Sequence, residues 1–247
     1  MKEWVVGRNP VMEVLQAKRR QVFRLMLASG IEEKGRIGEM LAAAARLRIP
    51  VERVPRERLD KMGENPQGVA VEVSSYPYVD LLDILDRARE RDEELFILVL
   101  DVLQNPQNLG TLLRTAEAAG VHGVLIPQHR AAEVTPAVVS ASAGASEHML
   151  VAQGNLVQSF ETLKKAGAWI VGLEGGERSR PIQEVPLSGP IAVVVGNEGE
   201  GMRALVRQSC DFLLSLPMHG RIESLNASVA GSIVLYQVVL ARLKGKE

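Results

Sequence analysis

The stretch "LFILVLDVLQNPQNLGTLLRTAEAAGVHGVLIP", residues 95–127, holds the pattern that decides the fold. An apolar run of strand length is followed by a polar loop, an amphipathic helix that begins near Asn108, and a second apolar run. The alternation continues through "HMLVA", "WIVGLE", "IAVVVG" and "DFLLSLP", and it ends in a long helix from about Ser224. Apolar strands that alternate with amphipathic helices predict a mainly parallel sheet covered on both faces.

The first third of the chain has a different pattern. Residues 22–28, 49–54 and 68–76 read as strands and residues 34–48 as a helix, which together predict a small α/β domain. Residues 77–94 carry a few leucines among dense alternating charges, which favours a connecting helix over a core helix. We therefore expect a small α/β domain at 1–75, a linker at 76–94 and a larger α/β domain at 95–247.

The net charge of −1 hides an asymmetry along the chain. Residues 1–75 hold 14 Lys and Arg against 10 Asp and Glu, a balance of +4, and the remaining residues hold 15 against 20, a balance of −5. A positive first third can approach the phosphates of a nucleic acid by charge alone. Lysines and arginines that merely coat solvated helices give the same balance, so both interpretations stay open at this point.

Cysteine and histidine usage bounds the setting. The single cysteine, Cys210, cannot form an internal disulfide, and the four histidines show no metal-ligand spacing. Charged residues interrupt the N-terminal stretch, and the longest apolar runs are of strand length. The sequence therefore predicts a cytoplasmic protein with no metal, no signal peptide and no membrane span.

Ligands of parallel α/β sheets bind outside the carboxyl ends of the strands, which directs attention to three loops. In the first, after residues 95–101, Asn108 can cap the following helix and Gly120 can end it in the left-handed conformation. Arg114 lies in the second turn of that helix. Its guanidinium suits a phosphate or a carboxylate, although a solvated helix arginine accounts for it equally.

The second loop follows residues 191–195. Gly199, Gly201 and Ala204 fit G-x-G-x-x-A between a strand and a helix, as in dinucleotide-binding sites. However, Glu198 and Glu200 would place carboxylates beside a pyrophosphate, and the next strand ends without an acidic residue for a ribose. An acidic, glycine-rich turn favours a neutral or cationic ligand, and the alternative is a tight turn in which glycines supply positive φ.

The third loop is "LPMHGRIESLNASVAG", residues 216–231. Ser224 or Asn226 can be the N-cap of the last helix, and a helix needs only one cap, so the other side chain is left for a different role. Along that helix an apolar stripe at helical spacing predicts a core-facing surface. Its members are Val229, Ile233, Tyr236 and Leu240.

Three segments, in this order, resemble the three motifs of a known family. They are "NPQNLGTLLRTAEAAGV", "VVVGNEGEGM" and "LPMHGRIESLNASVAGSIVLYQ", and the family is the SpoU family of RNA ribose 2′-O-methyltransferases, within the SPOUT class. "SASAGASEH" (140–148) is similar to a further segment of the family, and "NPQGVAVEV" (65–73) resembles the end of its N-terminal substrate-binding domain. The resemblance covers nearly the whole chain and is strongest to bacterial 23S rRNA guanosine 2′-O-methyltransferases.

The resemblance implies an α/β domain with a deep C-terminal trefoil knot, an exception to the rule against threaded chains, preceded by a small RNA-binding α/β domain. It also implies a homodimer. In the family the knot holds S-adenosylmethionine, the methyl donor. The matching positions here are Gly196, Leu216 and Leu225, with Asn197 and Met218 as neighbours.

The same resemblance implies a catalytic group made of Asn108, Arg114, Glu198, Ser224 and Asn226. The expected reaction is attack of a ribose 2′-hydroxyl on the donor methyl, with release of S-adenosylhomocysteine and without a metal. Positioning of the two reactants would supply much of the rate, while Ser224 and Asn226 orient the ribose.

The arginine that matches Arg114 has been proposed within the family as the general base. Neutralising an arginine at pH 7 costs roughly 9 kcal/mol, because its reference pKa is near 13.8 and each unit costs about 1.36 kcal/mol. We therefore favour a role in which Arg114 fixes the adjacent RNA phosphate and stabilises the developing alkoxide.

Three alternatives stay open at the level of sequence. A tRNA ribose methyltransferase of the same family would share every motif. A catalytically silent RNA-binding relative would keep the fold, and the presence of the whole catalytic group argues against it. A nicotinamide-dependent oxidoreductase would rest on the G-x-G-x-x-A match alone.

Overall fold

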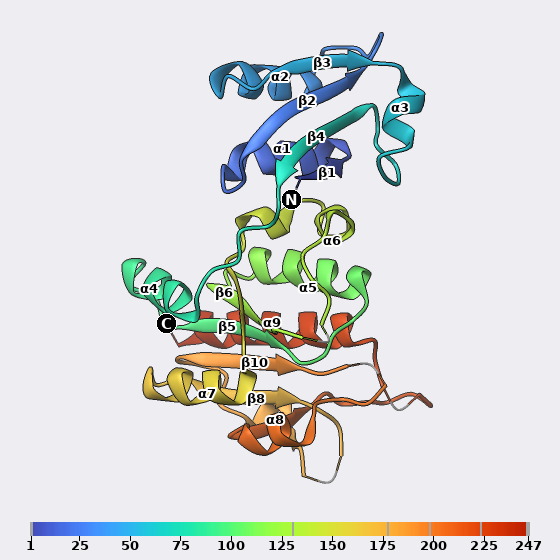
Figure 1. Cartoon of the computed structure of the whole chain (residues 1–247). Coiled ribbons are helices and arrows are strands. Elements are labelled where there is room, and N and C mark those ends of the chain that lie inside the picture. Colours follow the sequence, from blue (N-terminus) through green and yellow to red (C-terminus); the bar gives the residue numbers. More distant parts are fainter. Residues whose placement is uncertain (1, 130, 177, 198, 223, 246–247) are drawn as a thin grey trace. The chain divides into compact units, whose positions relative to one another are not determined.

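The computed structural model describes residues 2–129, 131–176, 178–197, 199–222 and 224–245 (Figure 1). The chain forms two compact units. Unit 1 comprises residues up to 77 together with residues 133–148, and unit 2 comprises residues 78–132 and 149–247.

Unit 1 is a small sheet with helices packed on it. Its strands are β1 (Lys2–Val6), β2 (Val22–Ala28), β3 (Val51–Val54) and β4 (Val69–Ser74), in the order β1-β4-β2-β3. Its helices are α1 (Arg8–Ala17), α2 (Arg36–Arg46), α3 (Arg56–Asp60) and α6 (Pro136–Ala141), with a 3₁₀ turn, η1 (Ala145–His148). β4 pairs antiparallel with β1 and β2, whereas β2 and β3 are parallel. The sequence predicted β2, β3, β4 and α2, and it missed β1, α1 and α3.

A buried ion pair ties residues 133–148 into unit 1. Arg20 donates two hydrogen bonds to the carboxylate of Glu147, at 3.0 and 2.9 Å, and a third to Glu3 at 2.8 Å. The side chains of Arg20 and Glu147 are 0% and 1% exposed. Burial raises the pKa of the Glu147 carboxyl, and the nearby Arg20 opposes that shift. Tyr76 adds a hydrogen bond from its hydroxyl to the carbonyl of Ser146.

Unit 2 is built on a seven-stranded sheet, in which every pairing between the described strands is parallel. The strand order is β7-β6-β5-β10-β8-β11-β9. The strands are β5 (Phe96–Leu100), β6 (Gly123–Pro127), β7 (Val151–Gly154), β8 (Trp169–Leu173), β9 (Arg180–Pro181), β10 (Ile191–Val195) and β11 (Phe212–Ser215). The α/β fold class with a mainly parallel sheet is thus confirmed, and the trefoil knot stays a prediction.

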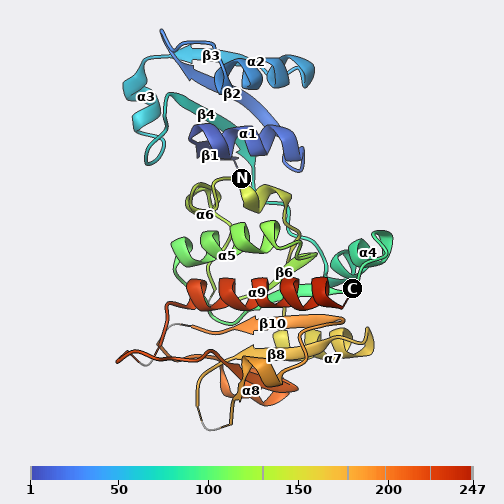
Figure 2. The same cartoon turned by 180° about the vertical axis from the view of Figure 1, so that it is seen from behind.

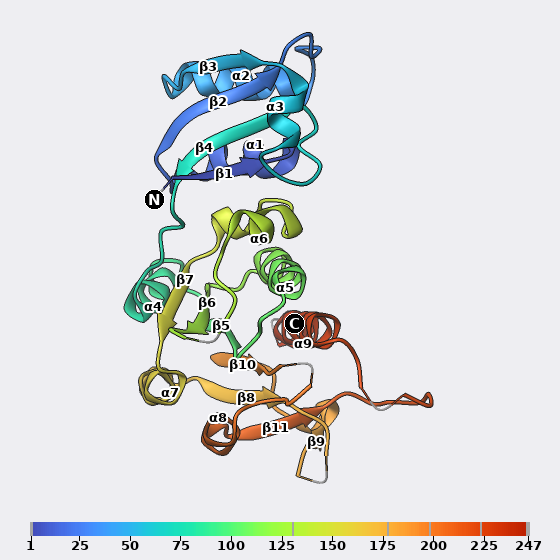
Figure 3. The same cartoon turned by 45° about the vertical axis from the view of Figure 1, so that its right-hand side comes forward.

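Helices cover both faces of this sheet. They are α4 (Leu81–Glu90), α5 (Pro106–Ala118), α7 (Leu156–Lys165), α8 (Ala204–Ser209) and α9 (Ala227–Lys244), with a 3₁₀ turn, η2 (Ile182–Glu184). Figure 3 shows α5 and α9 on one face and α4, α7 and α8 on the other. α5 and α9 also run side by side in the rear view of Figure 2.

The helix predicted to be a connector is part of the core. Ile84, Leu85 and Ala88 of α4 are buried in the same cluster as Ile97 and Val99 of β5. The dense charges of α4 occupy its other faces, so the expectation of a connecting helix is wrong here. The division of the chain into 1–75, 76–94 and 95–247 stays a prediction.

The prediction that the apolar stripe of α9 faces the core is also wrong. Val229, Ile233, Tyr236 and Leu240 are between 39% and 48% exposed. The buried face is the neighbouring one, which carries Ala227, Ser228, Gly231, Val234, Leu235 and Val238. Since α9 is apolar nearly all round, the sequence pattern could not choose between the two faces. α9 is also the one described helix that is long and apolar enough to cross a membrane, by length and composition alone.

His122 fixes the connection between α5 and β6. The side chain is 1% exposed, and its Nδ1 accepts a hydrogen bond from the backbone N–H of Phe96 at 3.0 Å. Nε2 lies 2.9 Å from a carboxylate oxygen of Glu93, so Nε2 carries the proton of a neutral ring. Burial lowers the pKa of His122, and Glu93 opposes that shift.

Candidate active site

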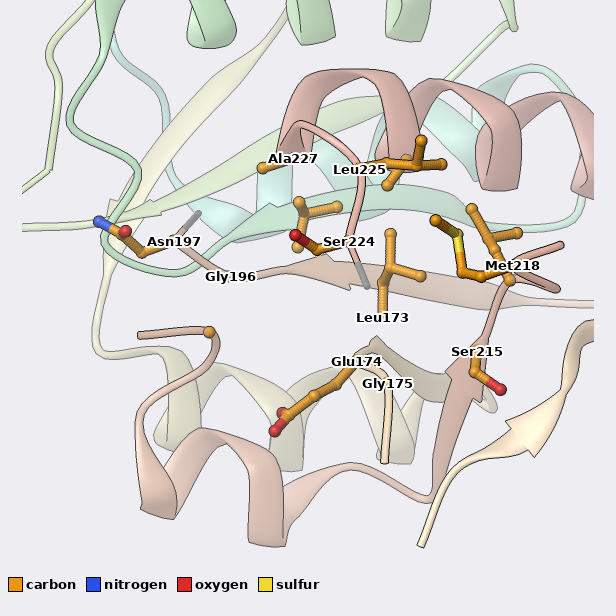
Figure 4. Close-up of a pocket in the computed structure, with 14 residues that line it drawn as sticks. Leu173, Glu174, Gly175, Gly196, Asn197, Ser215, Met218, Ser224, Leu225 and Ala227 are labelled. Atoms are coloured by element: carbon orange, nitrogen blue, oxygen red, sulfur yellow. The ribbon is translucent and has the colours of Figure 1, made fainter. Parts of the chain in front are cut away.

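A pocket of about 220 Å³ opens at the carboxyl ends of three neighbouring strands of unit 2. Leu173 ends β8, Val195 ends β10 and Ser215 ends β11, and all three line the pocket. The position agrees with the general rule for ligand sites in parallel α/β sheets. The loop before α9 closes the other side, as Figure 4 shows with Ser224 and Leu225 above the end of β8.

Most of the lining is apolar. The walls come from Leu173, Val195, Leu216, Met218, Leu225, Ala227 and Ala230. The polar side chains in the lining are Glu174, Asn197, Ser215 and Ser224. The five residues expected to contact the methyl donor, Gly196, Asn197, Leu216, Met218 and Leu225, all line this pocket. The structure therefore brings them together, and their roles stay predictions.

The glycine-rich turn after β10 folds back onto itself. Asn197 and Gly201 exchange two backbone hydrogen bonds of 3.0 Å, and Gly201 has a φ of 69°. A Cβ on Gly196 would lie 2.4 Å from the carbonyl carbon of Gly201, so only glycine fits there. Glu198, which belongs to the expected catalytic group, lies outside the described residues.

The side chain of Asn197 holds this turn in place. Its Nδ2 donates to the carbonyl of Val102, at 3.1 Å, and its Oδ1 accepts from the backbone N–H of Gly199, at 2.9 Å. Both polar ends are thereby occupied within the chain. Asn197 links the turn after β10 to the loop after β5. It also lines the pocket, but both polar atoms of its side chain already form hydrogen bonds within the chain.

Glu174, which lines the pocket, is a site residue that sequence reasoning missed, and Asp101 is a buried carboxylate that supports the neighbouring turn. Glu174 directly follows β8 and accepts a hydrogen bond from Nε of Arg207 at 2.7 Å. Asp101 is fully buried after β5 and accepts from the backbone N–H and Nε of Arg203, at 2.8 and 2.7 Å. Both were visible as acidic residues at the carboxyl ends of apolar strands. Asp101 fixes Arg203, the N-cap of α8, and Glu174 holds Arg207 within that helix.

Asn226 is the N-cap of α9, one of the two candidates that the sequence offered. Its Oδ1 accepts from the backbone N–H groups of Ser228 and Val229, at 2.9 and 3.3 Å. Ser224 is exposed and lines the pocket instead. The two residues therefore have separate places at the start of the helix.

Asn108 is not a helix cap, which corrects the prediction. The cap of α5 is Asn105, whose Oδ1 accepts from the N–H of Gln107 at 2.8 Å, with Pro106 in the first turn. Asn108 is 7% exposed and faces α9. Its Oδ1 accepts from Nδ2 of Asn226 at 3.2 Å and from Oγ of Ser228 at 3.3 Å. Asn108 and Asn226, two members of the expected catalytic group, are thus in direct contact.

Arg114 lies on the exposed surface of α5. Among the described residues its guanidinium has no hydrogen-bond or ion-pair partner, so it is available to an anion from outside the chain. The structure brings Asn108 and Asn226 together and places Arg114 six residues after Asn108 on α5, with no hydrogen bond to either of them within the described part of the chain.

Cys210, the single cysteine, is partly buried. Burial raises the pKa of its thiol to about 12, and Asp211 adds to that shift. The thiolate, which is the reactive form, is therefore scarce at neutral pH. The side chain packs against the core cluster of unit 2 beside Gly172.

The fold and the site together define an α/β enzyme domain with an apolar ligand pocket and a neighbouring cluster of polar side chains. Residues 95–236 match the model of the SpoU rRNA Methylase family, and residues 4–79 match a model described as RNA 2′-O ribose methyltransferase substrate binding.

Relatives and solved structures resemble nearly the whole chain. YacO of Bacillus subtilis strain 168, assigned to the TrmH family of tRNA/rRNA methyltransferases, is 40% identical over 97% of this chain and 96% of its own. The SpoU methyltransferase AviRb from Streptomyces viridochromogenes, solved in complex with the cofactor AdoMet, is 25% identical with a TM-score of 0.82, over 99% of this chain and 92% of that one. An AdoMet-bound rRNA methyltransferase from Sinorhizobium meliloti, 22% identical over 96% of this chain and 86% of that one, shares the fold with a TM-score of 0.77.

The chain belongs to the SpoU rRNA methylase family. It is an RNA 2′-O-ribose methyltransferase of the SpoU and TrmH type, with an N-terminal substrate-binding domain.

Proposed function

We propose that this enzyme transfers the methyl group of S-adenosylmethionine to the 2′-hydroxyl of a guanosine ribose in 23S ribosomal RNA. The observation that carries the proposal is the pocket at the ends of β8, β10 and β11, beside the Asn108–Asn226 contact. Each of the three ordered motifs contributes residues to this pocket or to that contact. The choice of 23S rRNA rests on the resemblance of the motifs.

The pocket suits the methyl donor in its chemistry. Its leucine, valine, alanine and methionine walls suit the apolar faces of an adenine, and Ser215, Ser224 and Glu174 offer polar groups at its edges. S-adenosylmethionine supplies an electrophilic methyl group on a sulfonium. The residues of the pocket hold the methyl group against the RNA. They also keep the Glu174 carboxylate near the sulfonium, whose positive charge it favours.

The polar residues around the pocket fit the acceptor side of the reaction. The 2′-hydroxyl must lose its proton as the methyl group is transferred, and negative charge develops on the oxygen. We assign to Arg114 the binding of the adjacent phosphate and the stabilisation of that charge, because a planar guanidinium pairs well with phosphate oxygens. Ser224 orients the ribose from the pocket wall.

Unit 1 supplies the cations for RNA binding. Six of its basic side chains have no acidic partner among the described residues: Arg8, Lys18, Arg46, Arg48, Arg56 and Lys61. Its other described arginines and lysines, apart from Arg19, form ion pairs with glutamates. RNA binding by this unit should therefore weaken steeply with salt.

We also propose a homodimer whose interface includes α9. Its exposed apolar residues recur at intervals of four and three: Val229, Ile233, Tyr236, Leu240 and Leu243. This spacing draws one continuous stripe along the helix, as in paired helices that bury such a seam. A second copy would cover the stripe with its own, because a two-fold axis brings the same surface of both chains together. We further propose that the protein is cytoplasmic.

Two measurements test the proposal. Calorimetric titration should show binding of S-adenosylmethionine and no binding of NAD, which separates a methyltransferase from an oxidoreductase. Transfer of a tritiated methyl group should then be measured with separate unmodified transcripts of 23S rRNA, 16S rRNA and tRNA. Label in 23S rRNA alone supports the proposed target, and label in tRNA alone would replace it. Donor binding without transfer to any RNA would indicate a catalytically silent relative.

A further inference from the structure

Asn108 has one polar atom without a partner. Its Nδ2 is buried and makes no hydrogen bond within the described residues, whereas its Oδ1 accepts two. A buried N–H donor that stays unpaired costs about 1–3 kcal/mol. Such groups normally have an acceptor in the working state of a protein. Asn108 therefore offers a donor that nothing in the described chain uses.

The orientation of the Asn108 amide follows from the cap of α9. The Oδ1 of Asn226 is identified as oxygen because it accepts from two backbone N–H groups, of Ser228 and Val229, which can only donate. The other end of that amide is then Nδ2, a donor. Since it lies 3.2 Å from Asn108, the atom of Asn108 that it meets must be the oxygen. The N–H₂ group of Asn108 is thereby left as the free end.

Ser228 reinforces this arrangement from the first turn of α9. The residue is 4% exposed, and its Oγ lies 2.6 Å from Oδ1 of Asn226 and 3.3 Å from Oδ1 of Asn108. Both neighbours are acceptors, so the single hydroxyl hydrogen is shared between them. A flip of the Asn108 amide would place its N–H₂ group against the Nδ2 of Asn226, which is also a donor, and the hydroxyl of Ser228 would lose the Asn108 oxygen to which it donates. Asn226 thus sets the orientation of the Asn108 amide, and Ser228 holds both side chains in place.

On the basis of the proposed function, we infer that Ser228 is a positioning residue for methyl transfer. It holds the amide of Asn108 so that Nδ2 donates a hydrogen bond to an oxygen of the bound RNA. Asn108 then acts as a hydrogen-bond donor in the active site. A side chain with only acceptor oxygens at this position would not make the same hydrogen bond to the RNA. Ser228 has no contact with the RNA and acts through Asn108.

A double-mutant cycle tests the inference. The rate of single-turnover methylation, with saturating donor and RNA, is measured for the wild type, Ser228→Ala, Asn108→Ala and the double variant. Ser228→Ala should slow transfer about tenfold in the wild-type background, the worth of one hydrogen bond. In the Asn108→Ala background the same substitution should slow transfer less than about twofold, because the side chain that Ser228 positions is absent.

Three further chains sharpen the test. Asn108→Asp replaces the free N–H₂ group by an oxygen of the same size, so it should be as slow as Asn108→Ala. Ser228→Thr keeps the hydroxyl and should restore most of the rate lost in Ser228→Ala. Ser232→Ala is the matched control, because Ser232 makes a 2.9 Å hydrogen bond to Thr115 between the same two helices, away from Asn108. It should leave the rate within about twofold of wild type.

Each outcome supports or overturns the inference. An equal loss from Ser228→Ala in the wild-type and in the Asn108→Ala background would overturn it, since Ser228 would then act through the helix cap alone. Near-normal transfer by Asn108→Asp, or an equal loss from Ser232→Ala, would overturn it as well. Urea unfolding of the four chains tests the network without RNA: the two stability losses should be sub-additive, and full additivity would contradict the contact. Failure of the proposed function looks different, because the wild type itself would transfer no methyl group.

Discussion

Gly196→Ala should weaken binding of the methyl donor while leaving the rest of the fold in place. The added Cβ would lie 2.4 Å from the carbonyl carbon of Gly201, 2.5 Å from the backbone nitrogen of Met202 and 2.7 Å from the oxygen of Gly201. These are backbone atoms of the turn that lines the pocket, so no flexible side chain can move aside. The turn must shift by about 1 Å to reach ordinary contact, which begins near 3.4 Å.

Crowding of this kind costs about 1–3 kcal/mol. Since a tenfold change in affinity corresponds to about 1.4 kcal/mol, the dissociation constant for S-adenosylmethionine should rise roughly 5- to 150-fold. Calorimetric titration measures this change, and a thermal unfolding curve shows whether the variant is folded during the titration.

Gly220→Ala is the matched control for this substitution. Gly220 lies in the loop that leads to α9, has no positive φ, and has nothing within 4 Å of an added Cβ. Its donor affinity should stay within about twofold of wild type. Wild-type affinity in Gly196→Ala would refute the reasoning, because it would mean that the turn after β10 is not part of the donor site.

Three further predictions follow from the packing. Arg20→Met leaves Glu147 buried without its partner and should lower the free energy of unfolding by about 3–5 kcal/mol in urea titrations, whereas Arg20→Met combined with Glu147→Leu should restore most of it. If both variants lost the same free energy of unfolding, the unpaired Glu147 carboxylate would not be the cause of the loss. Burial lowers the pKa of His122 in the folded chain, so the unfolded chain binds the proton first as the pH falls. The stability that the neutral ring contributes is therefore fully present above pH 6.5. Below that pH it decreases by up to about 1.4 kcal/mol per pH unit. His122→Asn should flatten the curve below pH 6.5, and an unchanged slope would exclude this histidine. Leu240→Glu places a charge in the exposed stripe of α9 and should shift sedimentation from dimer toward monomer, while a dimer of unchanged affinity would exclude this stripe from the interface.

The sequence predicts the architecture well because the pattern of a buried parallel strand is strong and local. β2 has the bounds that the sequence suggested, and α2 lies within the expected range. The face of α9 was not predictable, since apolar residues on both sides give no contrast between inside and outside. The place of residues 133–148 in unit 1 depends on Arg20 and Glu147, which lie 127 residues apart and form a pair that periodicity does not reveal.

The site was predictable where it depends on the ends of strands. Leu216 and Met218 follow β11 and line the pocket, as expected from the rule for parallel sheets. Asn108 was assigned to the wrong structural role, although Asn105 before a proline is the stronger cap signal. The contact of Ser228 with Asn108 needs two packed helices and defined rotamers, which a sequence pattern does not contain.

The position of the transferred methyl group tests the central claim most directly. After transfer from labelled S-adenosylmethionine to a 23S rRNA transcript, alkaline hydrolysis cleaves every linkage that has a free 2′-hydroxyl. The label should be recovered in an alkali-resistant dinucleotide that begins with guanosine. Label recovered in single nucleotides would place the methyl group on a base and would contradict a ribose 2′-O-methyltransferase.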